Sequence, residues 1–172
     1  MIDDVSYQNN THNVPEIIDY SELNDYSDVI SKAIIGGLQG QLAHVKTLVA
    51  MPAYNEAAHI ADVIAGAMQF ADRVLVVDDG STDETVAIAE ALGAIVVRHA
   101  TNRGYGGALQ TIFSTARRMG VEELVIIDAD GQHDPEDIPR LLSELRSGND
   151  VVIGSRFLEG SVGDIPTYRM VG

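Results

Sequence analysis

A chain of 172 residues with 45% hydrophobic content is long enough for one domain with a real core and too apolar for a disordered tail. The formal net charge of −15 argues against nucleic acid as a partner, because nucleic-acid phosphates require a basic surface. The absence of cysteine excludes disulfides, thiolate zinc sites and cysteine nucleophiles.

Residues 1–44 are predicted to form an acidic N-terminal extension that is partly helical or disordered. Residues 1–28 are polar and acidic without a sustained period, whereas residues 29–42 have helical spacing that three glycines weaken. The first residues lack the positive charge and apolar core of a signal peptide, and no apolar run reaches the roughly 18 residues that cross a bilayer. We therefore expect a cytoplasmic protein.

From residue 45 onward, apolar strand-like runs alternate with helical stripes, which predicts a single α/β domain with a doubly wound, mostly parallel sheet and helices on both faces. Strands are predicted over residues 45–51, 73–77, 94–97, 124–127 and 151–153. Helical stripes are predicted between them, over residues 57–68, 88–92, 108–119 and 138–145.

Short polar residues predict where these helices begin. Asn55 is predicted to cap the first helix of the domain, and Ser81 with Glu84 matches an S-x-x-E capping box for the second. Asp134 followed by Pro135 predicts a capped start for the last helix, because proline is favoured at the first helical position.

The strand at residues 124–127 is apolar throughout and runs directly into an acid pair, Asp128 and Asp130, with an amide carbonyl at Gln132. An isolated D-x-D is most often a solvated turn, and that interpretation stays open for the acid pair alone. Here a buried strand precedes it and a capped helix follows. This context favours an oxygen-rich turn that binds a hard divalent cation together with a diphosphate.

Polar residues stand at the same end of every predicted strand. Right-handed crossovers bring the carboxyl ends of parallel strands to one edge, so we expect these residues to share a crevice: Tyr54, Glu56, Asp79, Asp128, Asp130 and Arg156. Tyr54 and Pro52 are suited to flank a planar base, and Glu56 and Asp79 to accept hydrogen bonds from base or ribose. Arg156 is suited to a phosphate oxygen.

Other polar residues in these turns have simpler interpretations. Asp78 is predicted to be a turn residue and not a ligand. His133 is predicted to be a solvated turn histidine, and the alternative that it approaches the cation or substrate stays open. The glycines at 104, 106 and 107 do not form a G-x-G-x-x-G fingerprint, so backbone freedom beside a ligand stays an open alternative. No role is assigned to His99.

With these residues in place, the chain resembles the family 2 glycosyltransferases of the GT-A fold, and most of all the dolichol-phosphate mannosyltransferase group. The resemblance covers residues 46 to about 170 and rests on motifs in the family's order: PAYNE (52–56), VDDGSTD (77–83), NRGYGGA (102–108), DADGQH (128–133) and GSRF (154–157). It implies a GT-A, Rossmann-like catalytic domain over residues 45–172.

The resemblance also implies roles for individual residues. The implied nucleoside contacts are Pro52, Tyr54, Glu56, Val77 and Asp79. The implied sugar-diphosphate contacts are Asp128, Ala129 and Asp130. Asp130 and Gln132, beside Asp128, are implied ligands of Mg²⁺ or Mn²⁺. Arg156 is implied to reach the donor phosphates, and Arg169 is a looser match to a further arginine there.

The implied reaction is transfer of one sugar with inversion, from a donor of the GDP-mannose or UDP-glucose type to a polyprenyl (dolichyl) phosphate at the cytoplasmic face of a membrane. A phosphate acceptor fits because its oxygen is already anionic and needs no general base. Family members continue past the position of Gly172, so we expect a chain shortened on its acceptor side that binds donor better than it catalyses transfer.

Two alternatives from other classes stay open. One is a catalytically silent module that binds a nucleotide sugar. The other is a receiver-like phosphoacceptor domain, which the sequence disfavours because no lysine follows Lys46.

Overall fold

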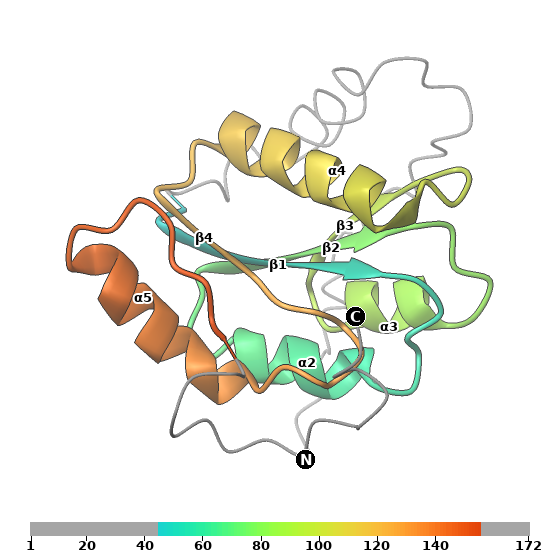
Figure 1. Cartoon of the computed structure of the whole chain (residues 1–172). Helices are drawn as coiled ribbons and strands as arrows, with labels where there is room; N and C mark the ends of the chain where they lie inside the picture. Colours follow the sequence, from blue (N-terminus) through green and yellow to red (C-terminus); the bar gives the residue numbers. More distant parts are fainter. Residues whose placement is uncertain (1–44, 156–172) are drawn as a thin grey trace, which may run out of the picture.

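The computed structural model describes residues 45–155 (Figure 1). The predicted N-terminal extension with its marginal helix, and the predicted site residues Arg156 and Arg169, lie outside the described residues.

Four parallel strands form the sheet: β1 (Thr47–Ala53), β2 (Arg73–Asp78), β3 (Ile95–Arg98) and β4 (Glu123–Ile126). Their spatial order is β3-β2-β1-β4, and every neighbouring pair is parallel. The chain therefore moves outward from β1 to β3 and then crosses to the other side of β1. The order reverses between β1 and β4, and open α/β sheets bind their ligands beyond the carboxyl ends of strands at such a reversal.

Helices cover both faces of this sheet, as predicted. The α4 helix (Gly104–Met119) lies on one face, and α2 (Ile60–Ala67), α3 (Thr85–Ala91) and α5 (Ile138–Arg146) lie on the other (Figure 1). A 3₁₀ turn, η3 (Pro135–Asp137), leads into α5.

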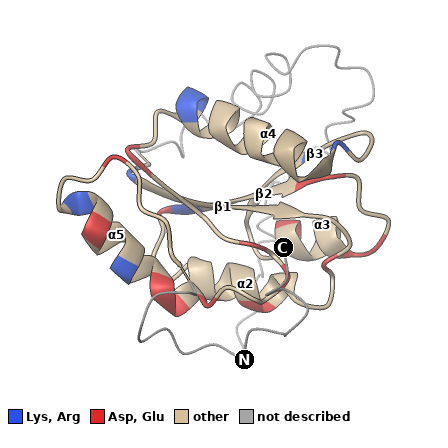
Figure 2. Ribbon diagram, in the orientation of Figure 1, with Lys and Arg blue, Asp and Glu red and all other residues tan. Residues whose placement is uncertain are grey.

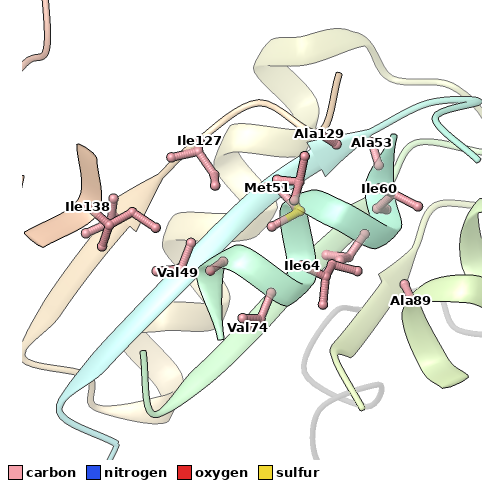
Figure 3. Packing of buried hydrophobic residues seen from close by; sticks show 14 of the residues in the cluster. Val49, Met51, Ala53, Ile60, Ile64, Val74, Ala89, Ile127, Ala129 and Ile138 are labelled. Atoms are coloured by element: carbon pink, nitrogen blue, oxygen red, sulfur yellow. The ribbon is translucent and has the colours of Figure 1, made fainter. Parts of the chain in front are cut away.

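The central strand β1 supplies alternate side chains to two cores. Val49 and Met51 belong to the core shared with α2, α3 and α5, part of which is shown in Figure 3. Leu48 and Ala50 belong to the core beneath α4. Burial on both faces explains why the β1 sequence is almost continuously apolar instead of alternating.

The predicted strand at residues 151–153 is wrong for the described structure, in which these residues form no strand. Val151 is 74% exposed and Ile153 is 82% exposed. A three-residue apolar run without burial lacks the packing that drives strand pairing. The other four strands are confirmed, with boundaries shifted by one or two residues.

Two of the predicted helix caps are also wrong. The α2 helix begins after His59 and not at Asn55, and α3 begins after Glu84, so Ser81 lies too far upstream to form the predicted capping box. The third cap is confirmed, because Asp134 Oδ1 accepts a hydrogen bond from the Glu136 N–H at 3.0 Å.

An ion pair fixes α5 against the start of β4. Arg146 donates from Nε and from a terminal nitrogen to the two oxygens of Glu123, each at 2.7 Å, and the Thr47 hydroxyl donates to Glu123 Oε2 at 2.6 Å. These hydrogen bonds, those from Arg146 foremost, lower the pKa of Glu123 to about 2. Within residues 45–155, no helix combines the length and apolar character needed to cross a membrane.

Candidate functional site

A pocket of about 430 Å³ opens at the carboxyl ends of β1, β2 and β4. Its lining includes seven of the predicted site residues: Pro52, Tyr54, Glu56, Asp79, Asp128, Ala129 and Asp130. Acidic residues lie in the loops that follow these strands, as Figure 2 shows. A smaller hollow of about 250 Å³, between α2 and the turn at Gly131, contains none of the predicted residues. The predicted crevice is therefore present in the described part of the chain.

The acid loop after β4 is held by its own side chains. The Asp128 N–H donates to His133 Nδ1 at 2.9 Å, and the Gln132 N–H donates to Asp130 Oδ1 at 2.9 Å. Gly131 takes a positive φ of 74°, which glycine adopts without strain. His133 is thus a partner of the acid loop and not only a solvated turn residue.

Among the residues that line the pocket, Tyr54 is 49% exposed and Pro52 is half-buried. Glu56 lies beside them, and burial together with the Asp130 carboxylate raises the pKa of Glu56. The raised pKa of Glu56 reflects its partial burial beside the negative charge of Asp130.

The loops after β1 and β2 are joined by hydrogen bonds. The Asn55 N–H donates to Ser81 Oγ at 2.8 Å, and Asn55 Oδ1 accepts from the Thr82 N–H at 2.8 Å. The Glu56 N–H donates to the Thr85 hydroxyl at 2.8 Å. Two of these side chains, Asn55 and Ser81, were predicted to cap helices, and the contacts instead hold Tyr54 and Glu56 beside the end of β2.

Asp79 follows β2 and is 4% exposed, yet it lines the pocket. Its Oδ1 lies 2.7 Å from His99 Nδ1 and accepts the Arg103 N–H at 2.8 Å. The neighbouring Asp78 is fully buried, accepts the Ser81 N–H and pairs with Arg98 at 3.3 Å. Asp78 is therefore the last residue of β2 with a structural role, and not the turn residue that was predicted.

Sequence reasoning missed Tyr105, in the first turn of α4, which lines the pocket together with Asn102 and Gly104. The Tyr105 hydroxyl lies 3.5 Å from Asp128 Oδ1, and burial and the Asp128 charge raise the pKa of this tyrosine. The signal was available: the glycine-rich segment 102–108 follows β3, so its first residues had to reach the same edge of the sheet.

Two predicted site residues lie elsewhere. Val77 is fully buried in the core beneath α4, where its main chain pairs with Pro52. Gln132 is exposed and does not line the pocket. Their predicted contacts with nucleoside and cation stay predictions.

Within residues 45–155, no group of three or more His, Asp or Glu side chains is arranged to hold a metal ion by itself. The acid loop instead offers two carboxylates, Asp128 and Asp130, to one pocket. Such a donor set fits a divalent cation that takes its remaining ligands from water and from substrate phosphates, as Mg²⁺ commonly does.

The comparison with known families decides what this site belongs to. The protein-family model described as "Glycosyl transferase family 2" matches residues 48–170 of this chain. The chain belongs to glycosyl transferase family 2. The matched range contains every predicted site residue, from Pro52 to Arg169.

Curated relatives of this family 2 chain include lipid-phosphate enzymes. The chain is 40% identical over 136 residues to polyprenol monophosphomannose synthase of Mycolicibacterium smegmatis, covering 73% of this chain and 51% of that protein. It is 34% identical over 134 residues to dolichol-phosphate mannosyltransferase of Pyrococcus furiosus, covering 73% of this chain and 37% of that protein. The chain thus spans about half the length, or less, of these curated relatives.

A solved structure shares the fold. Glucosyl-3-phosphoglycerate synthase from Mycobacterium tuberculosis, in complex with Mn²⁺, UDP and phosphoglyceric acid, matches with a TM-score of 0.51 and 29% identity. The match covers 68% of this chain and 44% of that one. Together with the parallel sheet order, this likeness confirms the predicted GT-A, Rossmann-like α/β class for the family 2 chain.

Proposed function

We propose that this family 2 chain carries the donor-binding part of a glycosyltransferase that moves a sugar from a nucleoside-diphosphate sugar to a polyprenyl phosphate. The observation that carries the proposal is the single pocket in which Tyr54, Asp79 and Asp130 meet, although they follow three different strands. An aromatic ring, a buried carboxylate and an acid pair are the groups that a base, a ribose and a metal-bound diphosphate require.

Each side of the pocket has a proposed role. Tyr54 and Pro52 flank the base, and Asp79 and Glu56 accept hydrogen bonds from the nucleoside. Asp128 and Asp130 hold Mg²⁺ or Mn²⁺, with Gln132 as a further ligand. The bound ion supplies charge neutralisation for the leaving diphosphate. Arg156 and Arg169 are proposed, from the family resemblance, to stabilise the same developing charge.

The proposed acceptor is a polyprenyl phosphate, of the kind that the names of the curated relatives point to. A phosphate oxygen is anionic at neutral pH, so it attacks the anomeric carbon without a general base. Attack from the face opposite the leaving diphosphate inverts the anomeric configuration. The donor is of the GDP-mannose or UDP-glucose type, and the reaction is proposed to occur at the cytoplasmic face of a membrane.

The alternatives differ in what they demand of the pocket. A catalytically silent module would bind the nucleotide sugar through the same donor contacts but would not transfer the sugar. A receiver-like domain needs an accessible phosphoacceptor, whereas Asp78 is fully buried and paired with Arg98. The family match and this burial favour the transferase over the receiver.

A transfer assay tests the proposal. The 172-residue chain is incubated with Mn²⁺, a short polyprenyl phosphate, and GDP-mannose or UDP-glucose labelled in the sugar. We expect slow, metal-dependent movement of label into the lipid fraction, with inversion detected in the product by NMR, and none with Asp130→Ala. Donor binding without any lipid product would support the silent module, and a product with retained configuration would refute the proposed mechanism.

A further inference from the structure

His99 joins three elements behind the pocket. It follows β3 directly, and its side chain is only 1% exposed. Its Nδ1 lies 2.7 Å from Asp79 Oδ1, beyond β2, and its Nε2 lies 2.9 Å from the Thr111 hydroxyl, on the inner face of α4. A buried imidazole with a partner on each nitrogen has a fixed orientation.

The direction of these hydrogen bonds follows from the groups themselves. An ionised carboxylate only accepts, so Nδ1 carries the hydrogen of the bond to Asp79. The Thr111 hydroxyl both donates and accepts, and the Gly107 carbonyl oxygen lies 3.1 Å from it as a second acceptor. Thr111 can therefore satisfy Nε2 whether or not that nitrogen is protonated, while Nδ1 keeps donating to Asp79.

These bonds leave one oxygen of Asp79 for a ligand. Oδ1 accepts from both His99 and the Arg103 N–H, at 2.7 and 2.8 Å. Within residues 45–155, no hydrogen bond engages Oδ2. Asp79 also lines the pocket, so a carboxylate that is held through Oδ1 borders the cavity.

We propose that His99 is a positioning residue for nucleoside recognition: it fixes the Asp79 carboxylate so that Oδ2 meets the base or ribose, and Thr111 fixes the imidazole in turn. This inference rests on the proposed role of Asp79 as a nucleoside contact. Its rival is a purely structural role, in which His99 only ties α4 to the sheet. The two differ because positioning acts on the nucleoside alone, whereas loss of packing disturbs every ligand of the pocket.

Two amide substitutions separate these roles, because each keeps a different half of the imidazole. The side-chain nitrogen of asparagine stands near the position of Nδ1, so His99→Asn keeps a donor for Asp79. Glutamine reaches toward the position of Nε2, so His99→Gln keeps a partner for Thr111 and removes the donor to Asp79. Thr111→Val keeps the volume of the threonine and removes the hydroxyl that orients the ring.

The measurement is calorimetric binding of UDP, of GDP and of inorganic pyrophosphate, each with Mn²⁺, to the 172-residue chain and these variants. For the nucleotide that the wild type prefers, we expect His99→Gln to weaken the binding affinity about tenfold. Thr111→Val should weaken it less. His99→Asn should bind this nucleotide nearly as tightly as the wild type does. Pyrophosphate affinity is expected to stay within about twofold in all three. In an Asp79→Asn background, His99→Gln is expected to add no further loss.

Equal losses for nucleotide and pyrophosphate, or equal losses for the asparagine and glutamine variants, would overturn the positioning role and support the structural one. A nucleotide affinity that falls with Asp79→Asn and ignores His99→Gln would also overturn it, while leaving the proposed function intact. Binding of pyrophosphate with no binding of either nucleotide by the wild type would instead refute the proposed function.

Discussion

The main-chain nitrogen of Asn55 lies 2.8 Å from Ser81 Oγ, which joins the loop after β1 to the loop after β2. The Asn55 side chain completes the link by accepting the Thr82 N–H, and Asn55 itself adopts a φ of 56°. Both loops contribute to the pocket, so this link sets the distance between its Tyr54 side and its Asp79 side.

Substitution of Asn55 should separate backbone strain from the lost hydrogen bond. Asn55→Ala removes the acceptor and puts alanine, which tolerates a positive φ less well than asparagine does, at this position, so we expect a loss of about 2 kcal/mol in the free energy of unfolding. Glycine adopts a positive φ without strain, so Asn55→Gly should lower the free energy of unfolding by about half as much as Asn55→Ala does. Asn55→Asp keeps an acceptor and should stay near wild type. Urea unfolding measures all three, and equal losses for alanine and glycine would contradict this account.

Gly66 should resist a substitution that normally stabilises helices. A Cβ built at Gly66, in α2, would stand 2.7 Å from Cγ of Pro135, a rigid ring that cannot move aside easily. We expect Gly66→Ala to lower the free energy of unfolding by about 1 to 3 kcal/mol, despite a helix-propensity gain of about 1 kcal/mol. Gly106→Ala, in α4, is the matched control, because a Cβ there meets nothing within 4 Å. A stabilising Gly66→Ala would show that α2 and η3 are not tightly packed.

The Glu123 ion pair should give the stability a defined acid dependence. The pKa of Glu123 is lowered from 4.5 to about 2 in the folded chain, so its contribution is complete above about pH 4.5 and is lost as pH falls toward 2. We expect Glu123→Gln to cost about 1 to 2 kcal/mol at pH 7, and the difference from wild type to shrink between pH 4.5 and 2. Urea unfolding at several pH values checks this, and a difference that stays constant across the range would contradict it.

The parallel core and the acid-pair edge could be predicted from sequence because both depend on local signals. Apolar runs longer than three residues mark strands buried on both faces, and the carboxyl-end rule then gathers the polar residues that follow them. The run at 151–153 was too short for this inference, and its side chains are exposed.

What sequence could not supply were partners distant along the chain. Asn55 and Ser81 have the spacing of helix caps, but their actual partners lie 26 and 27 residues away in the other loop. The sequence around His99 gave no signal of its role, because that role depends on hydrogen-bond contacts with Asp79 and Thr111, which lie elsewhere in the chain. Tertiary hydrogen bonds replaced the local ones that the motifs predicted.

Calorimetry of UDP and GDP, with and without Mn²⁺, tests the central claim most directly. We expect one nucleotide to bind with Mn²⁺, and its affinity to fall at least about tenfold, ~1.4 kcal/mol, without the metal or with Asp130→Ala. Asp137→Ala, which removes an exposed acid beyond the pocket lining, is the matched control and should bind as wild type does. Nucleotide binding that ignored Mn²⁺ and survived Asp130→Ala would contradict the account.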